Sequence, residues 1–188
     1  MGELPVTIHS YRWVLVVQDY LTKLVLMFPI ASKDGLTIAA LLVHQVFYRF
    51  GFPKKIQSDQ GSEFHNLLLR GILDAVSVKQ SISSACHPMS QGSVEKFNGT
   101  MKTYLSRLLK PEEENQWDMV LNRIEFAYNV SVHGSTLLSP FEMLYGYRPE
   151  CPLDVILDRN TILEWEDSER LRTFQISKKY IDSMIHYV

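Results

Sequence analysis

In Ile56-Gln-Ser-Asp-Gln-Gly-Ser-Glu-Phe64 one acid, Asp59, directly follows a short run that predicts a β-strand. A second stretch, His87-Pro-Met-Ser-Gln-Gly-Ser-Val-Glu-Lys-Phe-Asn98, places Glu95 in the first turn of a helix. We expect this helix to begin at Ser93, after a polar loop, and to end near Leu109. Because strand ends deliver side chains to the ligand crevice of an α/β sheet, Asp59 is a candidate site residue. Glu95, at a helix start just after a loop, is a second candidate that can converge with it.

The spacing of these two acids is compatible with one shared metal site. Thirty-five residues separate Asp59 from Glu95, enough for a helix, a strand and a loop to return the chain to Asp59. Mg²⁺ and Mn²⁺ prefer carboxylate and water oxygens. Two such cations stabilise the attacking and leaving oxygens in phosphoryl transfer. Pairs of acids are common in proteins, however, so the spacing alone favours ordinary solvated surface acids.

Upstream, the chain predicts a hairpin and then a helix. The segments Arg12–Asp19 and Leu24–Ile30 are rich in β-branched residues, and residues 19–23 between them predict a turn. From Thr37 to Phe50 apolar residues recur at helical spacing, and a Gly-Phe-Pro sequence ends the pattern. The positions expected to face inward are Ile38, Leu41, Leu42, Val46 and Phe50.

The remaining pattern predicts a mixed α/β domain. Two short strands, Lys55–Ser58 and Ser77–Ser81, flank a helix expected over Glu63–Ala75. Further helices are expected from about residue 115 to 132 and from Ser139-Pro140 onward. This order favours a mixed sheet with an antiparallel edge. Residues 1–150 form one expected domain, and residues 151–188 an extension or linker that is partly helical.

Composition narrows the class of protein. The chain has 188 residues, 46% apolar and 21% charged, which is typical of a globular domain. Its net charge of −2 argues against a strongly basic nucleic-acid binder, but Glu95–Lys110 holds four bases and one acid. Cys86 and Cys151 form no CxxC pair, so neither a zinc site nor a disulfide framework is indicated. No apolar run approaches the roughly 20 residues of a membrane span.

Four blocks of the chain, in order, resemble retroviral and Ty3/gypsy-type integrases. The stretches around Asp59 and Glu95 are similar to the blocks around that family's second Asp and its Glu, at the family's spacing. Tyr11–Lys23 is similar to the family's second strand. The similar downstream segments are Phe126-Ala-Tyr-Asn129, His133, Ser139-Pro-Phe-Glu142 and Tyr145-Gly-Tyr-Arg-Pro149. The resemblance covers roughly residues 2–150 and implies an RNase H-like core, a mixed five-stranded sheet flanked by helices.

The resemblance also implies an Asp-Asp-Glu triad, of which Asp59 and Glu95 match the last two members. Asp19 could be assigned to the first position of the triad, but it lies on the segment similar to the family's second strand. The family's first Asp stands on the preceding strand, ahead of a turn that Gly2-Glu-Leu-Pro5 matches. We therefore expect a truncated first strand and a missing first Asp, with Asp19 as the weaker alternative for a third acid. Catalysis is then impaired, because each member of such a unit is needed.

The helix that carries Glu95 is also expected to contact DNA. Glu95, Asn98, Gly99 and Lys102 share one face at i, i+3, i+4 and i+7. The family more often has a basic or polar residue at the position of Gly99. The resemblance implies contacts to DNA near the metals, some of them from the loop before the helix, whereas a solvated basic face is the ordinary alternative. The DNA-binding candidates are Ser90, Gln91, Lys96, Asn98 and Lys102.

Two functions of different class stay open. The resemblance implies a nuclear retroelement integrase core that performs Mg²⁺- or Mn²⁺-dependent 3′-end processing and DNA strand transfer. Its partners would be retroelement ends, target DNA and a second copy of the chain, with no membrane involved. The alternative is a catalytically inactive, domesticated integrase-derived domain that binds nucleic acid or protein. An RNase H-like nuclease acting on hybrids fits the fold, but not the block around Glu95.

Overall fold

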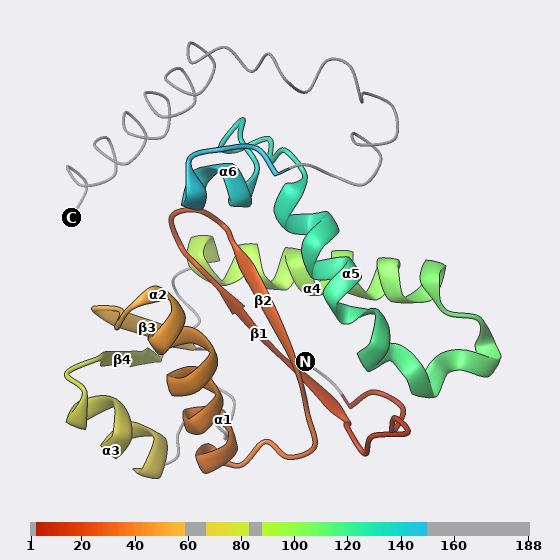
Figure 1. Cartoon of the computed structure of the whole chain (residues 1–188). Coiled ribbons are helices and arrows are strands. Elements are labelled where there is room, and N and C mark those ends of the chain that lie inside the picture. Colours follow the sequence, from red (N-terminus) through yellow and green to blue (C-terminus); the bar gives the residue numbers. More distant parts are fainter. Residues whose placement is uncertain (1–2, 59–66, 83–87, 150–188) are drawn as a thin grey trace. The chain divides into compact units, whose positions relative to one another are not determined.

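The computed structural model describes residues 3–58, 67–82 and 88–149 (Figure 1). The chain divides into two compact units, which we describe separately. The first unit comprises Met1–Val16 and Met27–Leu121, and the second comprises Val17–Leu26 and Asn122–Val188. For residue 68, residue 82 and residues 88–93 only the backbone is described.

The predicted hairpin is confirmed. Strands β1 (Trp13–Gln18) and β2 (Val25–Ile30) pair with each other. The Arg12 amide donates to the Ile30 carbonyl at 3.0 Å at one end, and the Asp19 amide donates to the Leu24 carbonyl at 2.8 Å at the other. These bonds bracket the turn where the sequence predicts it.

The first helical segment differs in register from the prediction. It consists of α1 (Gly35–Leu41), a π-helical stretch η1 (Leu42–Phe47) and a short α2 (Tyr48–Phe50). Phe47 is buried and Phe50 is exposed, the reverse of the expectation for Phe50. A π-helix brings residues five apart onto one face. The inward positions therefore run from Ile38 to Leu42 and then to Phe47.

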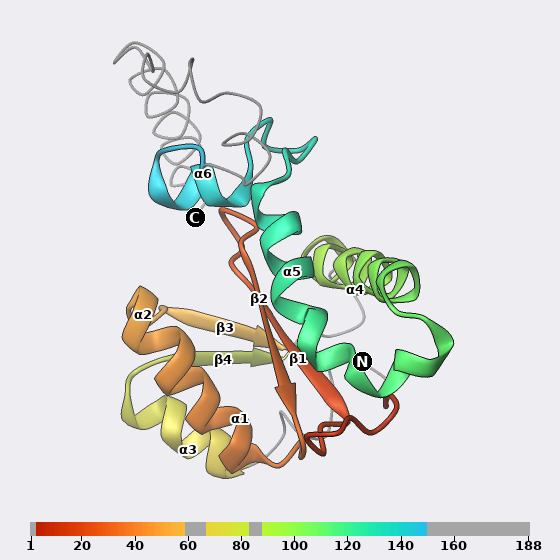
Figure 2. The same ribbon diagram turned by 45° about the vertical axis from the view of Figure 1, so that its right-hand side comes forward.

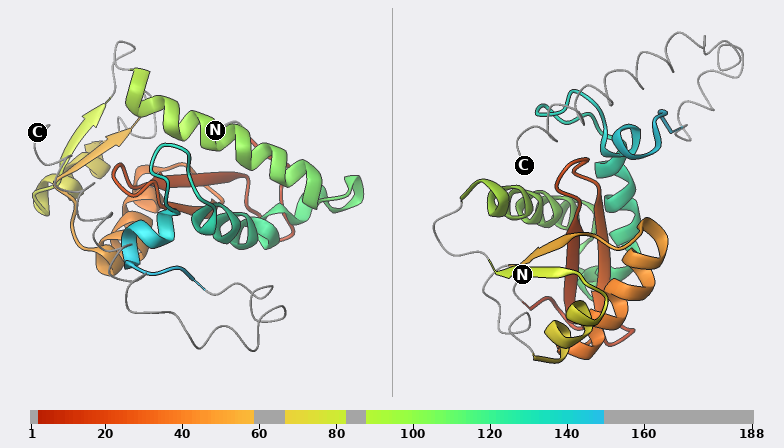
Figure 3. Two further views of the ribbon diagram at one scale, coloured as in Figure 1. Left: turned by 90° about the horizontal axis from the view of Figure 1, so that it is seen from above. Right: turned by 90° about the vertical axis from the view of Figure 1, so that its left-hand side faces the viewer.

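Strands β3 (Lys55–Ser58) and β4 (Lys79–Ile82) form a parallel pair, with α3 (Leu67–Ala75) between them in sequence. Lys55 lies opposite Lys79, and Ser58 lies opposite Ile82. Figure 2 shows α1 and α3 on the same side of this pair, where they pack against each other. Figure 3 shows β3 and β4 side by side from two further directions. Buried Ile38, Leu69, Leu73 and Val78 contribute to the core here.

The expected single sheet of five strands is not seen in the described residues, which form two sheets of two strands each. Both β3 and β4 are only four residues long, short for strands that must hold a wide sheet together. The segment before β1 is irregular and is held by other contacts. The Ile8 amide donates to the Asn115 carbonyl at 3.1 Å, and the Trp117 indole donates to the Pro5 carbonyl at 2.7 Å.

The last four elements are helical. The long helix α4 (Pro88–Leu108) is followed by the 3₁₀ stretch η3 (Pro111–Gln116), α5 (Trp117–Val130) and α6 (Pro140–Tyr145). The expected helix start at Ser93 is wrong, because α4 already begins at Pro88, and residues 88–92 of the expected loop are helical. Residues 83–87 of that loop lie outside the described residues. Proline is tolerated in the first turn of a helix, where its missing amide hydrogen would be unpaired anyway. No helix in the described ranges is long and apolar enough to cross a membrane.

Candidate functional site

Helix α4 holds Glu95 on its solvent-exposed side. Phe97, Met101 and Leu105 are buried at i, i+4 and i+8, so they form the inward ridge of this helix. Glu95 and Lys102 are consequently exposed, at positions about two turns apart on the opposite side. This part of the helix can present both a carboxylate and an ammonium group to the same bound polyanion.

Asn98 lies at the edge of the buried ridge, one turn after Glu95. Its Oδ1 atom is buried and has no hydrogen-bond partner. A buried amide oxygen without a donor is costly, so this atom is suited to accept a hydrogen bond or to face a cation. Carboxylate and amide oxygens together form the donor type that hard divalent cations prefer. Glu95 and Asn98 therefore fit Mg²⁺ in chemical type.

Ser58 is a feature that sequence reasoning missed. It is the last residue of β3 and the direct neighbour of Asp59, and its buried hydroxyl has no hydrogen-bond partner. Its place beside a candidate acid was a signal in the sequence, but serine is too common at strand ends to be noticed without the burial.

Several predicted site residues lie outside the described part. Asp59 falls in residues 59–66, so its position relative to Glu95 is not described. Ser90 and Gln91 have helical backbone within α4, but their side chains are not described. Among the described residues, no group of three or more His, Cys, Asp or Glu side chains is placed to hold a metal ion.

Asp19 uses its carboxylate to close its own turn. Its Oδ2 atom accepts hydrogen bonds from the Thr22 amide at 2.7 Å and from the Thr22 hydroxyl at 2.8 Å. The Lys23 amide donates to the Asp19 carbonyl at 3.0 Å. This arrangement explains an acid directly after β1 by local structure, without a ligand.

The basic residues predicted to contact DNA are free to do so. Lys96 and Lys102 are exposed on α4, and neither forms an ion pair with a carboxylate of the described residues. Gly99, between them in sequence, is also exposed, and a Cβ atom there would meet nothing within 4 Å. The departure from the family at this position is therefore not forced by packing.

The downstream blocks similar to integrases have structural roles within the second unit. The Tyr128 and His133 rings pack edge to face with centroids 4.5 Å apart. Burial raises the pKa of the Tyr128 hydroxyl, an effect opposed by a hydrogen bond from Gln18. Ser139 and Glu142 form a reciprocal capping box at the start of α6, at 3.1 and 2.9 Å. These contacts need no ligand to explain them.

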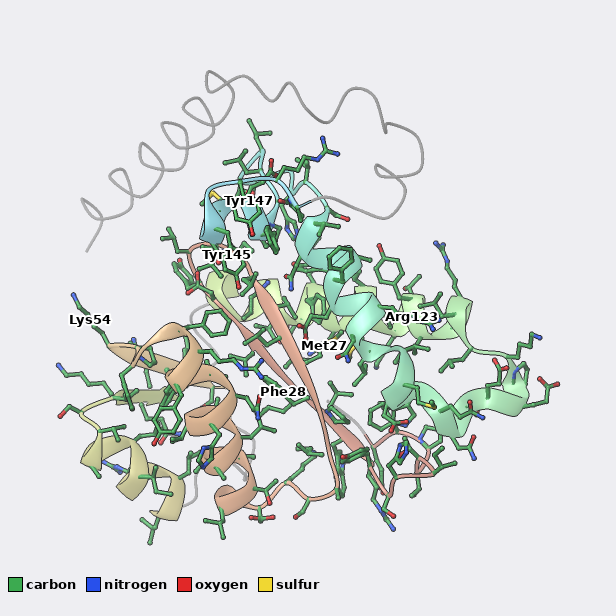
Figure 4. The ribbon with its side chains drawn as sticks, viewed as in Figure 1. Met27, Phe28, Lys54, Arg123, Tyr145 and Tyr147 are labelled. Carbon is green, nitrogen blue, oxygen red and sulfur yellow. The ribbon has the colours of Figure 1, made fainter. Side chains whose placement is uncertain are left out.

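The aromatic residues differ in their burial. Trp117 is buried and Trp13 is partly buried, whereas Phe126 is exposed. Tyr145 and Tyr147 are also exposed and lie together at the end of α6 (Figure 4), with centroids 6.3 Å apart.

An open groove in the first unit lies beside β2 and the α1–η1 segment. None of the described residues that line it is a carboxylate. Its lining residues are Tyr11, Phe28, Pro29, Ala40, Leu41, His44 and Gln45.

The chain is similar in sequence to parts of retroviral polyproteins. It is 30% identical over 140 residues to the Gag-Pol polyprotein of avian reticuloendotheliosis virus, covering 74% of this chain and 12% of that polyprotein. It is 29% identical over 149 residues to the Gag-Pol polyprotein of baboon endogenous virus (strain M7), covering 79% of this chain and 8% of the polyprotein. The chain thus spans only about a tenth of these relatives. No family model matches it.

Solved structures with the same fold are integrase catalytic cores. The HTLV-2 integrase catalytic core domain in complex with magnesium (trimeric form) has a TM-score of 0.59 and 18% identity, over 74% of this chain and 89% of that one. The catalytic core domain of BIV integrase has a TM-score of 0.57 and 19% identity, over 70% and 84%. A simian T-cell lymphotropic virus intasome in complex with PP2A regulatory subunit B56 gamma has a TM-score of 0.61 and 19% identity, over 78% and 53%. The RNase H-like class predicted from the sequence is confirmed.

Proposed function

Because this chain is a retroviral-type integrase core, we propose that it supports divalent-metal-dependent polynucleotidyl transfer, that is, 3′-end processing and DNA strand transfer. The observation that supports this most directly is the arrangement on α4. An exposed Glu95 lies one turn before the unpaired amide oxygen of Asn98 and about two turns before an exposed Lys102. We assign to that face the contact with the reacting DNA end.

Each residue has a distinct part in this proposal. Asp59 and Glu95 are the carboxylates that hold Mg²⁺ or Mn²⁺, which when bound stabilises charge on the attacking and leaving oxygens. The Asn98 amide oxygen accepts a hydrogen bond at the edge of the site. Lys96 and Lys102 bind phosphates and set the path of the DNA strand across α4. Ser90 and Gln91, one to two turns earlier, extend this path.

We further propose that transfer by the 188-residue chain is impaired. Two cations about 4 Å apart need a carboxylate that bridges them. Asp19 is poorly suited to that role, because its carboxylate already accepts two hydrogen bonds from Thr22. A metal bound through Oδ2, the oxygen that accepts both bonds, would displace them and open the turn between β1 and β2.

The same observation favours a second candidate function. If the Asp19 carboxylate stabilises only its own turn, the core has no third acid for catalysis. It can still bind nucleic acid through Lys96 and Lys102 on α4, without turnover. In that case Lys102→Glu weakens DNA binding, while Glu95→Gln changes nothing measurable.

The test is disintegration of a branched DNA substrate with Mn²⁺. We expect little turnover by the chain itself and substantial turnover after an N-terminal extension that adds a strand bearing an Asp. In the extended protein, Asp59→Asn and Glu95→Gln should each abolish activity, and Asp19→Asn should retain it. Robust turnover by the unextended chain that Asp19→Asn abolishes would refute the assignment of Asp19. Inactivity of the extended protein would favour the binding function.

We extend the proposal to assembly and location. The relatives named above include a trimeric core and an intasome, and exposed Met119 and Phe126 lie seven residues apart on α5. We propose that the chain self-associates and acts on DNA in the nucleus. Sedimentation of the chain against a Met119→Lys/Phe126→Lys variant tests the association.

A further inference from the structure

The segment between η1 and β3 exposes aromatic rings beside basic side chains. Helix α2 ends at Phe50 and is followed by Gly51, where the chain turns towards β3 with a φ of +89°. We call this surface the aromatic–basic edge. It consists of Tyr48, Arg49, Phe52, Lys54, Lys55 and Lys79.

The two rings of this edge are held in place although they face solvent. The Phe52 ring lies 5.3 Å from the ring of Phe47, which is only 2% exposed and therefore fixed in the core. The Tyr48 ring is edge-on to the His44 ring at 5.5 Å and lies 6.3 Å from the Phe52 ring. Tyr48 is nevertheless 67% exposed and Phe52 51% exposed. Fixed, exposed rings of this kind are suited to stack against a planar partner.

Three basic residues of the edge have neighbouring backbone positions at the start of β3 and β4. Lys55 lies opposite Lys79 across the parallel β3–β4 pair, and the Lys79 amide donates to the Lys54 carbonyl at 3.2 Å. Figure 4 shows the Lys54 side chain pointing away from β3. Within the described ranges no carboxylate pairs with these lysines or with Arg49. Like charges opposite each other destabilise a sheet, so an anionic partner would stabilise this end of the strands.

We propose that the aromatic–basic edge binds single-stranded nucleic acid. Arg49, Lys54, Lys55 and Lys79 contact phosphates, and unpaired bases stack on Tyr48 and Phe52. A duplex keeps its bases stacked inside and offers only phosphates to such a surface, which leaves the rings without a role. The combination of fixed rings and unpaired cations therefore selects single strands.

This surface is distinct from the proposed catalytic face. It lies at the start of β3, and three steps of about 3.3 Å separate Lys55 from Ser58 at the other end of the strand, after which Asp59 follows in sequence. Its cations come from α2, β3, β4 and the segment before β3, and none comes from α4. Binding at this surface requires neither a metal ion nor Glu95. It can therefore be tested independently of catalytic activity.

The test is fluorescence anisotropy of a labelled oligo(dT) of about 20 nucleotides, measured with the full chain and without divalent cations. Tyr48→Ala should weaken binding about tenfold, and Tyr48→Trp should retain it, because the larger ring still stacks. Lys54→Glu/Lys55→Glu should weaken binding more than tenfold and flatten its dependence on salt.

Matched controls separate this surface from general charge. Arg123→Glu/Arg148→Glu changes the net charge by the same amount at exposed positions of the second unit, and Tyr147→Ala removes an exposed ring there. These variants should bind oligo(dT) like the parent chain. Circular dichroism melting confirms that each variant is folded.

Three results would overturn the proposal. The first is equal affinity of oligo(dT) for the parent, Tyr48→Ala and Lys54→Glu/Lys55→Glu. The second is a matching loss with a duplex of the same length for both variants, which would make the edge a general polyanion surface. The third is altered sedimentation without altered oligonucleotide binding, which would assign the edge to contact with a second copy of the chain.

Discussion

Asn129 holds the backbone of Val25 through both of its amide atoms. Its Oδ1 accepts from the Val25 amide at 2.9 Å, and its Nδ2 donates to the Val25 carbonyl at 2.7 Å. Asn129 is buried, and Val25 begins β2. The side chain thus completes the hydrogen bonding of a strand from a helix, within the second unit.

Replacing this residue should therefore be costly. Asn129→Ala leaves a buried amide and a buried carbonyl of Val25 unpaired, and we expect a loss of about 3 kcal/mol in the free energy of unfolding. Urea denaturation measures this change in the free energy of unfolding. Asn122→Ala, an exposed position on the same helix, is the matched control and should change stability by less than about 0.5 kcal/mol. Equal losses of stability in the two variants would show that the hydrogen bonds from Asn129 to Val25 do not stabilise the fold.

Asp19 should prove to be a turn residue. Asp19→Ala removes both hydrogen bonds from Thr22 and should destabilise the fold by about 1 kcal/mol. A double-mutant cycle with Thr22→Ala should give a coupling energy of at least about 0.5 kcal/mol, because the two residues contact each other directly. A coupling near zero, together with loss of Mn²⁺ binding in Asp19→Ala, would instead make Asp19 a metal ligand.

Two glycines should respond in opposite ways to alanine. Gly99 lies inside α4 with open space around its Cα, so Gly99→Ala should stabilise by about 1 kcal/mol and raise Tm by about 2–4 °C. Gly51 has φ +89° and ψ 168°, a conformation that side chains rarely adopt. Gly51→Ala should destabilise by about 1–3 kcal/mol despite equally open space. Calorimetry of Gly99→Ala and Gly51→Ala measures both changes in stability. A destabilising Gly99→Ala would contradict the placement of Gly99 inside α4 with open space around it.

The start of α1 should make stability depend on pH in acid. The Asp34 carboxylate accepts from the Thr37 amide and from the Thr37 hydroxyl, and these bonds lower the pKa of Asp34 to about 2. A depressed pKa contributes stability that is present above the unfolded-state value near 3.8 and is lost as pH falls through about 2. Asp34→Asn keeps a capping side chain that does not titrate. The parent should lose stability relative to Asp34→Asn between pH 4 and pH 2, and a constant difference would contradict this.

Much of this fold could be predicted because local rules and packing agree. The hairpin, β3 and the cap of α6 follow from β-branched runs, a turn and a Ser-Pro-x-Glu box. The register of η1 could not be predicted. A pattern of 3.6 residues per turn places Phe50 inward, whereas the wider π-helical turn places Phe47 inward instead. The start of α4 was missed because Ser90 and Gly92 favour a loop, and intrinsic propensity is weaker than tertiary packing.

The candidate site also has features that the sequence predicts and features that only the structure reveals. Exposure of Glu95 and Lys102 follows from the spacing of Phe97, Met101 and Leu105. The unpaired amide oxygen of Asn98 depends on burial that no sequence pattern reveals.

We propose above all that Asp59 and Glu95 share a divalent cation. Crystals of the chain soaked in Mn²⁺, with anomalous difference maps, measure this directly. We predict a peak with carboxylate oxygens of both residues at about 2.1 Å, absent in Glu95→Gln crystals, and no peak at Asp19. Ordered carboxylates of Asp59 and Glu95 more than about 10 Å apart would be too far apart to share one ion. That result, or a peak that includes Asp19, would rule out the proposed metal site.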